Sequence, residues 1–180
     1  MAGKPSFYMD AIPDRVWRTE FYSPTTGVAT FLLPEIARFS GERTPKDRGP
    51  SECCVAAALT YGVPLWVGSI HPQVVEEVWD VQRAFDMSGA EFLPFWKQAL
   101  VACSDPEIRV SLWRKRDRLL LAVANFTDRE RTAELRLSAP GAAARFRGAW
   151  KAEGLTSSAD GARLTVPARR GALVLVDHPY

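Results

Sequence analysis

The chain has 180 residues, enough for one ordinary domain or two small ones, and 47% of them are apolar, so a disordered tail is excluded. No apolar run approaches the ~20 residues that a helix needs to cross a bilayer, and no membrane partner is expected. The opening residues, MAGKPSFYMDAIPDRVW, lack the apolar segment and the cleavage site of a secretory leader. No leader is therefore expected, and the compartment is left open.

The net charge of +2 is the sum of two halves of opposite sign. Residues 1–105 hold 9 basic and 13 acidic side chains, whereas residues 106–180 hold 14 basic and 8 acidic ones. The stretch SDPEI between them is rich in turn formers, and Pro106 disfavours a helix at Asp105. We therefore expect two domains, 1–105 and 106–180. The arginines of the second half are scattered rather than gathered in a stripe, so no nucleic-acid partner is expected.

The first half is predicted to mix helices and strands. Residues 50–61 form a run of strong helix formers, with Ser51 placed to cap the helix and Gly62 placed to end it. The apolar run VPLWVG, residues 63–68, follows between two glycines, as is typical of a buried strand. Residues 1–48 are predicted to be rich in loops, with short elements only.

A second helix is predicted from HPQVVEEVWDVQRAFDMSG, residues 71–89. Pro72 suits a first helical position, and Val74, Val78, Val81 and Phe85 recur at spacings of 4, 3 and 4. The order helix, buried strand, helix indicates α/β layering, in which helices cover a parallel strand.

The second half changes to a period of two, which is typical of strands with one buried face. The strands expected here are residues 108–114, 117–126, 131–137, 145–150, 162–166 and 172–176. The segment DRLLLAVANF, residues 117–126, is apolar on both faces and should be central. We therefore expect an all-β antiparallel sandwich of six or seven strands, and because ~70 residues is a small unit, it should dock on the first half through an apolar seam.

Several classes of site are excluded because their motifs are missing. The chain contains no phosphate loop, dinucleotide fingerprint, zinc spacing or nucleophile elbow, so no cofactor and no metal are expected. Three cysteines cannot all pair, and the adjacent Cys53 and Cys54 in a helical run are best interpreted as buried thiols. Residues Asn125 to Thr127 match a glycosylation sequon, but an asparagine entering a turn has a conformational explanation.

The loop after residues 63–68 is the best local candidate for a substrate-binding site. Ligands in α/β folds are contacted beyond the carboxyl ends of parallel strands, which points to Ser69, to His71 and, within the strand, to Trp66. Each has a simpler interpretation as well. Trp66 is explained by packing in the core, and His71, which stands just before Pro72, by a helix N-cap.

Glycosidic chemistry needs two carboxyl groups roughly 5 to 10 Å apart, and the first half contains carboxylates and aromatic residues that are candidates for it. No spacing distinguishes any pair, so a solvated surface role is favoured for each of Asp10, Asp14, Glu20, Glu35 and Glu42. The aromatic group Trp17, Phe21 and Tyr22 fits a seam between domains better than a sugar-stacking platform.

Two segments carry a resemblance to a known family. EFLPFWKQ, residues 91–98, and after a short linker IRVSLWRKRDRLLLAVANFTDRERTAELRLS resemble the junction between barrel and sandwich in glycoside hydrolase-like proteins similar to family 123 enzymes. The segment AAALTYGVPLW resembles a late-barrel segment of the same group, with Thr60, Tyr61 and Gly62 where that group has His-Asp. The similarity covers about residues 50–138.

The resemblance implies the last part of a TIM-type barrel followed by the sandwich, since a complete barrel takes ~250 residues and only 105 precede the sandwich. In the resembling enzymes the catalytic acidic pair lies earlier in the barrel and works with the N-acetyl group of the substrate. No position here matches that motif, so no catalytic residue is assigned. The expected partners are a carbohydrate or an upstream barrel segment.

Three hypotheses follow for the function. The first is the C-terminal portion of a glycoside hydrolase-like protein, inactive alone, in which the sandwich is an accessory domain. The second is a self-contained carbohydrate-binding or interaction module, in which Trp17, Tyr22, Trp66 or Trp96 stacks on sugar rings. The third is a small hydrolase that uses carboxylates of the first half.

Overall fold

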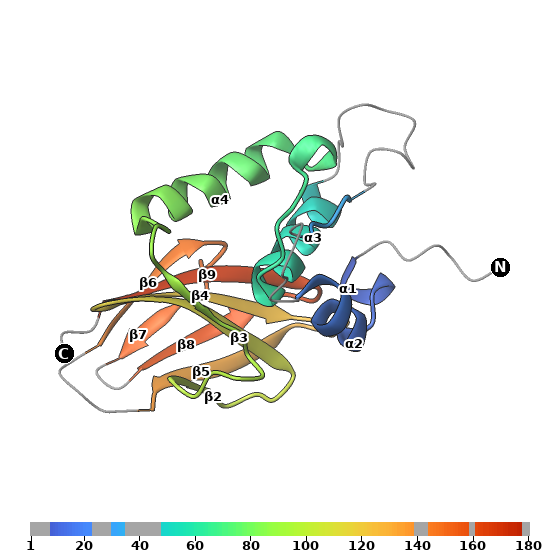
Figure 1. Cartoon of the computed structure of the whole chain (residues 1–180). Helices are drawn as coiled ribbons and strands as arrows, with labels where there is room; N and C mark the ends of the chain where they lie inside the picture. The colour runs from blue at the N-terminus through green and yellow to red at the C-terminus, as the bar shows by residue number, and fades with distance from the viewer. Residues whose placement is uncertain (1–7, 23–29, 35–47, 139–143, 159–160, 178–180) are drawn as a thin grey trace.

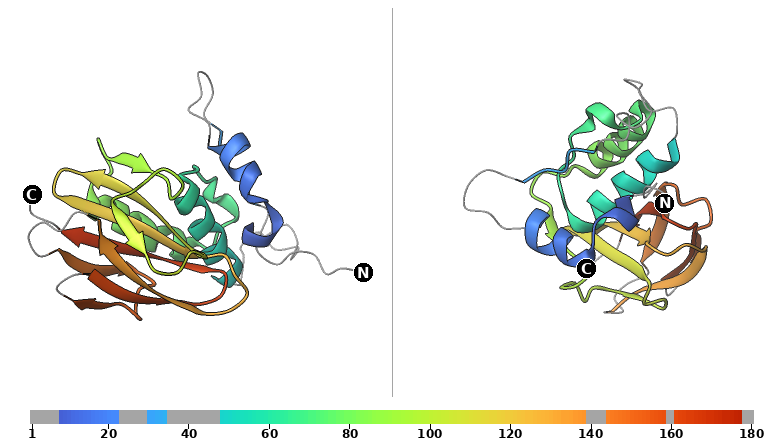
Figure 2. Two further views of the ribbon diagram at one scale, coloured as in Figure 1. Left: turned by 90° about the horizontal axis from the view of Figure 1, so that it is seen from below. Right: turned by 90° about the vertical axis from the view of Figure 1, so that its right-hand side faces the viewer.

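Two antiparallel sheets and a layer of helices make up the protein in the computed structural model, which describes residues 8–22, 30–34, 48–138, 144–158 and 161–177. Figure 1 shows the helices lying on one face of the larger sheet, with the smaller sheet behind the other face. Figure 2 shows the same three layers from two further directions.

The sheets contain nine strands within the described residues. The larger sheet has the order β1 (Glu91–Leu93), β3 (Ile108–Lys115), β4 (Arg118–Asn125), β9 (Arg170–Asp177) and β6 (Arg145–Trp150). The smaller sheet has the order β2 (Val101–Cys103), β5 (Arg131–Leu137), β8 (Gly161–Val166) and β7 (Thr156–Ser158). The predicted antiparallel sandwich is thereby confirmed, and the sheets also include β1 and β2, which precede Asp105.

Strand β4 is the middle strand of the larger sheet, as its two apolar faces predicted. Leu119, Leu121 and Val123 point into the core between the sheets. Leu120 and Ala122 point to the opposite face, where they pack in the core beneath the helices. Because alternate side chains of a strand point to opposite faces, burial of both sets requires a third layer over the sheet.

The third layer consists of short helices from the N-terminal segment and two longer ones. They are α1 (Tyr8–Ala11), α2 (Asp14–Val16), the π-helical turn η1 (Trp17–Phe21), α3 (Arg48–Tyr61), the 3-10 turn η2 (Val67–Ser69) and α4 (Pro72–Phe85). In Figure 1, α3 lies across β4 and β9, and α4 lies above α3 and β6. The apolar seam expected between the halves is this helix-to-sheet interface.

Helix α3 ends as the sequence predicts but does not begin there. Gly62 has a left-handed φ of +67°, and the N–H of Val63 bonds back to the carbonyl of Ala58 at 2.9 Å, which closes the helix in a Schellman turn. The predicted cap at Ser51 is wrong, because α3 already includes Arg48. Ser51 is buried inside the helix, where its Oγ accepts a hydrogen bond from the N–H of His71 at 3.0 Å.

Helix α4 follows the predicted pattern closely. It begins at Pro72, and Val74, Val78 and Phe85 are buried on its inner face. Asp86 ends the helix in a left-handed conformation, with φ 58°. The 3.6-residue period, together with Pro72 at the first helical position, predicted this element.

The buried strand predicted at residues 63–68 is wrong in its extent. One parallel bridge joins Leu65 to Leu32, and the chain then turns into η2. This bridge is the single parallel contact between strands in the described residues, so those residues do not themselves form a barrel.

Candidate functional site

The segment from Val63 to Val67 presents two different faces. Val63, Leu65 and Val67 line a groove that this segment forms together with α3 and α4. Trp66 points away from that groove and is 59% exposed, so the interpretation of Trp66 as a core residue is wrong. Its indole Nε1 lies close to Gly68, where an added Cβ would come within 2.8 Å of it.

Ser69 and His71 follow on the same loop. His71 is the residue before α4, and its carbonyl accepts the N–H of Val74 at 3.0 Å, which confirms the predicted N-cap position. Its side chain makes no capping bond, and its Nδ1 is buried without a hydrogen-bond partner among the described residues. Ser69 is half-buried in η2. The structure places Trp66, Ser69 and His71 on one loop, with no hydrogen bond described between their side chains, and substrate binding by them stays a prediction.

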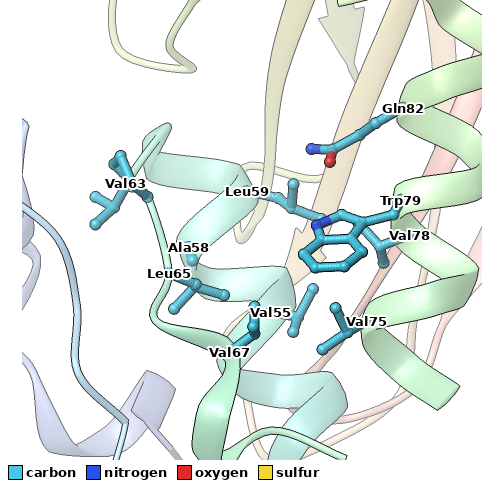
Figure 3. A pocket seen from close by; sticks show the side chains of 11 residues that line it. Val55, Ala58, Leu59, Val63, Leu65, Val67, Val75, Val78, Trp79 and Gln82 are labelled. Atoms are coloured by element: carbon cyan, nitrogen blue, oxygen red, sulfur yellow. The ribbon is translucent and has the colours of Figure 1, made fainter. Parts of the chain in front are cut away.

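The groove between α3 and α4 is apolar and was not predicted from the sequence. It encloses about 220 Å³. Figure 3 shows Trp79 and Gln82 of α4 facing Leu59 and Val55 of α3 across it. Trp79 is 46% exposed on an otherwise amphipathic helix, and that tryptophan among charged neighbours was the available sequence signal.

The aromatic residues of the N-terminal segment form a seam, as predicted. Trp17 is fully buried and stacks on Tyr61 of α3, with ring centroids 5.0 Å apart and planes 8° from parallel. Tyr22 meets Trp96 edge to face at 5.1 Å. Trp17 therefore has no exposed face for a sugar, which supports its packing interpretation over the stacking one.

A polar group lies at the end of this seam. The Tyr61 hydroxyl donates to Asp14 Oδ1 at 2.5 Å, and the Arg109 guanidinium contacts both groups. The same guanidinium lies 4.2 Å from the centroid of the Phe126 ring. Burial, and then the hydrogen bond to Asp14, raises the pKa of Tyr61 well above its ordinary value. Tyr61 is thus held neutral as a hydrogen-bond donor between helix and sheet.

The acidic candidates do not form a catalytic pair in the described residues. Asp10 pairs with Arg169 at 2.6 Å, Asp14 is engaged with Tyr61, and Glu20 is exposed. Glu35 and Glu42 lie outside the described residues. A general acid needs a raised pKa, whereas the carboxyl pKa values that are shifted are lowered, at Glu77, Asp86 and Asp105.

Neither a metal site nor a membrane span is found in the part of the chain that the structure describes. No cluster of His, Cys, Asp and Glu there could hold a metal ion, and no helix there is long and apolar enough to cross a membrane. Cys53 and Cys54 are buried free thiols, as expected, and burial raises the pKa of Cys53 to about 11 and that of Cys54 further.

Glu52 of α3 connects the helical layer to the sandwich. Its carboxylate lies 2.9 Å from Nζ of Lys151, which directly follows β6, and 3.4 Å from Nε of Arg170, the first residue of β9. Arg48, one turn earlier on the helix, has its Nε 3.3 Å from the same carboxylate. The Glu52 side chain is 12% exposed, so these pairs are screened less than ordinary surface pairs.

Glu77 of α4 makes the corresponding connection. It accepts Arg48 Nη2 at 2.7 Å and the Trp150 indole N–H of β6 at 3.0 Å. The hydrogen bond from Arg48, with that from Trp150, lowers the pKa of Glu77 below its usual 4.5. α4 is thereby tied both to α3 and to the larger sheet.

Glu77 should contribute to a loss of stability in acid. Because its folded pKa is lowered, its contribution is present above about pH 4.5 and is lost as the pH falls through the folded pKa. Since the Glu77 side chain is 39% exposed, we expect about 1 kcal/mol or less from it. Urea unfolding at pH 7 and pH 3.5 measures the change. Glu77→Gln keeps an acceptor for Trp150 and should lose less stability between these pH values than the wild type; equal losses would show that Glu77 makes no contribution.

The two stacked antiparallel sheets define a sandwich domain. It is joined to a helical segment that precedes it in the chain and covers one of its outer faces. The model of the glycoside hydrolase 123 C-terminal domain matches residues 74–177, which is more than half of the chain. The chain belongs to this family of C-terminal domains. None of the curated proteins compared with it matches the sequence.

Solved structures of similar fold come from longer enzymes. A noncanonic maltogenic α-amylase AmyB from Thermotoga neapolitana matches with a TM-score of 0.52 and 13% identity over 92% of this chain and 45% of its own. An α-amylase from Geobacillus thermoleovorans matches with a TM-score of 0.48 and 11% identity over 72% of this chain and 34% of its own. The chain therefore spans less than half the length of either, and the AmyB likeness concerns the fold alone.

Proposed function

We propose that this chain is the C-terminal portion of a glycoside hydrolase-like, carbohydrate-active protein, and that it is inactive on its own. The match of residues 74–177 to a glycoside hydrolase 123 C-terminal domain carries the proposal. The carboxylates support the second part, because those of the described residues are engaged in ion pairs or exposed singly and offer no acid held protonated beside a second carboxylate.

The residues before the sandwich are proposed to be the last part of a (β/α)8 barrel. Two observations support this: the parallel bridge between Leu32 and Leu65, and the order of α3, the segment 63–67 and α4, which repeats the helix and strand alternation of a barrel. In that arrangement residues 68–72 lie beyond the carboxyl end of a barrel strand. Trp66, Ser69 and His71 are accordingly proposed to contribute to a carbohydrate cleft.

The sandwich is proposed to act as an accessory domain that stabilises the barrel end. Its larger sheet supplies the surface on which α3 packs, and Trp150 and Lys151 bond to carboxylates of both helices. The outward positions of the smaller sheet carry threonine and charged side chains such as Thr132, Glu134 and Arg163, and no aromatic ring among the strands described. A sugar platform on that sheet is therefore disfavoured.

The proposal predicts that the purified chain does not turn over glycosides. Nitrophenyl glycosides, including N-acetylhexosaminides, should be hydrolysed no faster than in buffer, because the carboxylates of the described residues form no catalytic acidic pair. The release of nitrophenol measures this. Turnover that disappears when Asp14 or Glu20 is changed to the amide would overturn the proposal in favour of a small hydrolase.

The alternative is a carbohydrate-binding module without catalysis, and the exposure of Trp66 is the observation that favours it. Saturable binding of a polysaccharide, lost in Trp66→Ala and kept in Trp79→Ala, would support that function. Both tryptophans are large exposed rings, so the second substitution is a matched control.

A further inference from the structure

The beginning of α3 is bonded to the loop that precedes α4. Ser51 is fully buried, and its Oγ accepts the N–H of His71 at 3.0 Å. Three residues earlier on the helix, Arg48 donates from Nη1 to Oε1 of Gln73, in the first turn of α4, at 3.1 Å. These two bonds lie on either side of Pro72, so together they fix the direction in which the chain leaves the loop and enters α4.

The same part of α3 is bonded to the sandwich. Glu52, the residue after Ser51, pairs with Lys151 at 2.9 Å and with Arg170 at 3.4 Å. Arg48 completes the connection, because its Nε lies 3.3 Å from the Glu52 carboxylate. We call Arg48, Ser51 and Glu52 the α3 clamp. Through direct contacts this clamp joins the end of β6 and the start of β9 to the loop before α4.

Strand β6 is irregular where it meets the α3 clamp. The register of its pairing with β9 shifts between Gly148 and Trp150, and Lys151 then adopts a left-handed φ of 50°. Such a backbone is costly for a residue other than glycine, and it persists only where surrounding contacts require it. The contacts here are the ion pair of Lys151 with Glu52 and the hydrogen bond from the Trp150 indole to Glu77 of α4. The end of β6 is therefore shaped to contact both helices.

Low exposure makes the bonds of the α3 clamp strong constraints. Ser51 is fully buried, and the Glu52 side chain is 12% exposed. Water competes weakly for groups in such surroundings, and a bond that breaks there leaves a polar group unpaired. A displacement of Lys151 is therefore expected to move Glu52 and the beginning of α3 with it, and the loop bonded to Ser51 should follow.

We infer that the α3 clamp makes the sandwich a positioning element for the loop of Trp66, Ser69 and His71. The contacts at the end of β6 set where these side chains lie, and Ser51 is the positioning residue that holds His71. The inference rests on the proposed function, which assigns carbohydrate contact to this loop. It goes beyond a stabilising role of the sandwich, because it states that a change in the sandwich alters the geometry of the loop while the chain stays folded. The affinity of the loop for a carbohydrate is then regulated from the sandwich.

The test observes the loop in the folded chain while the sandwich is changed. Lys151→Met removes the ammonium group and keeps a long side chain, at a position that is 34% exposed. Arg147→Met is the matched control, because it removes a cation of the same part of the sheet that pairs with Asp177 of β9 instead of with a helix. Fluorine NMR of the chain labelled with fluorotryptophan reports on each of the six tryptophans, and Trp66→Phe identifies the resonance of Trp66. Hydrogen exchange at the His71 amide is the second readout.

Lys151→Met should shift the Trp66 resonance and speed exchange of the His71 amide about threefold, although it touches neither residue. Ser51→Ala, which removes the acceptor of that amide, should speed its exchange about fivefold and shift the Trp66 resonance as well. Arg147→Met should leave both signals as they are in the wild type, even where it lowers the melting temperature.

Two results would overturn the inference, whether or not Ser51→Ala folds. The first is a Trp66 resonance and a His71 exchange rate that stay unchanged in Lys151→Met. The second is a change in Arg147→Met as large as that in Lys151→Met, which would indicate general loosening of the fold. Both readouts use the chain without a sugar, so they test the coupling alone. Glycoside hydrolysis by the isolated chain would instead overturn the proposed function, and the two failures are therefore distinguishable.

Discussion

Replacing Gly171 by valine should destabilise the chain by about 3 kcal/mol, because it separates α3 from the larger sheet. Gly171 begins the buried part of β9, opposite Ala124. A Cβ there would lie 2.6 Å from the Cβ of Ala56 and 2.9 Å from the carbonyl oxygen of Val123. Neither atom can move alone, since one is fixed in a helix and the other in a ladder of hydrogen bonds, so the helix itself must shift.

Urea unfolding followed by tryptophan fluorescence measures this loss, and Gly89→Ala is the matched control. Gly89 has a positive φ of +70°, and a Cβ there would meet nothing within 4 Å, so it tests backbone strain without crowding. We expect about 1 kcal/mol from that strain. If Gly171→Val costs no more than Gly89→Ala, then α3 does not pack closely on the sheet and the seam described above is wrong.

The parts of the fold that the sequence predicted are those with a sustained period. Val74, Val78 and Phe85 repeat over the whole of α4, and the alternation of Ala133 and Leu135 in β5 leaves one buried face. These patterns identify which side of a helix or strand faces a core. They can therefore be read from the sequence even when the neighbouring elements are unknown. The two apolar faces of β4 likewise required a third layer, and α3 supplies it.

The errors fall where long-range partners determine the structure. The run VPLWVG has the composition of a buried strand, but a strand also needs neighbours on both edges, and the single bridge to Leu32 provides one residue of pairing. The side chains of this run are all apolar, but they are not all buried: Trp66 is exposed and Leu65 is only half-buried. Composition cannot distinguish a buried strand from an apolar surface that another polypeptide could cover.

The beginning of α3 was misplaced for a related reason. Ser51 is a good cap by residue type, and within α3 its hydroxyl has a different role, accepting the N–H of His71 from a loop 20 residues later. Such side-chain to backbone bonds between distant segments leave no periodic trace in a sequence. The groove between α3 and α4 was missed for the same reason, since it depends on how two helices cross.

Asn125 holds the turn after β4 together, and its position in a sequon is explained by that role. Its side chain is fully buried, and Nδ2 donates to the carbonyls of Arg129, Val166 and Pro167 at 2.8, 3.0 and 3.1 Å. Its Oδ1 accepts the N–H of Thr127 at 3.0 Å. An amide nitrogen that is buried and bonded in this way is not available for glycan attachment in the folded chain.

Asn125→Ala should therefore destabilise the chain by about 3 kcal/mol, since it leaves the carbonyls of Val166 and Pro167 and the N–H of Thr127 without the partner that the buried Asn125 side chain supplies, while the Arg129 carbonyl keeps the Thr127 hydroxyl at 3.0 Å. Thr127→Val is the matched control in the same turn. It removes a hydroxyl that donates to Asn125 Oδ1 at 2.7 Å but keeps every contact of the Asn125 amide nitrogen, so about 1 kcal/mol is expected. Chemical unfolding of the two variants gives both values. Equal losses would mean that the Asn125 side chain contributes no more than the threonine hydroxyl, and that the backbone alone fixes the turn between β4 and β5.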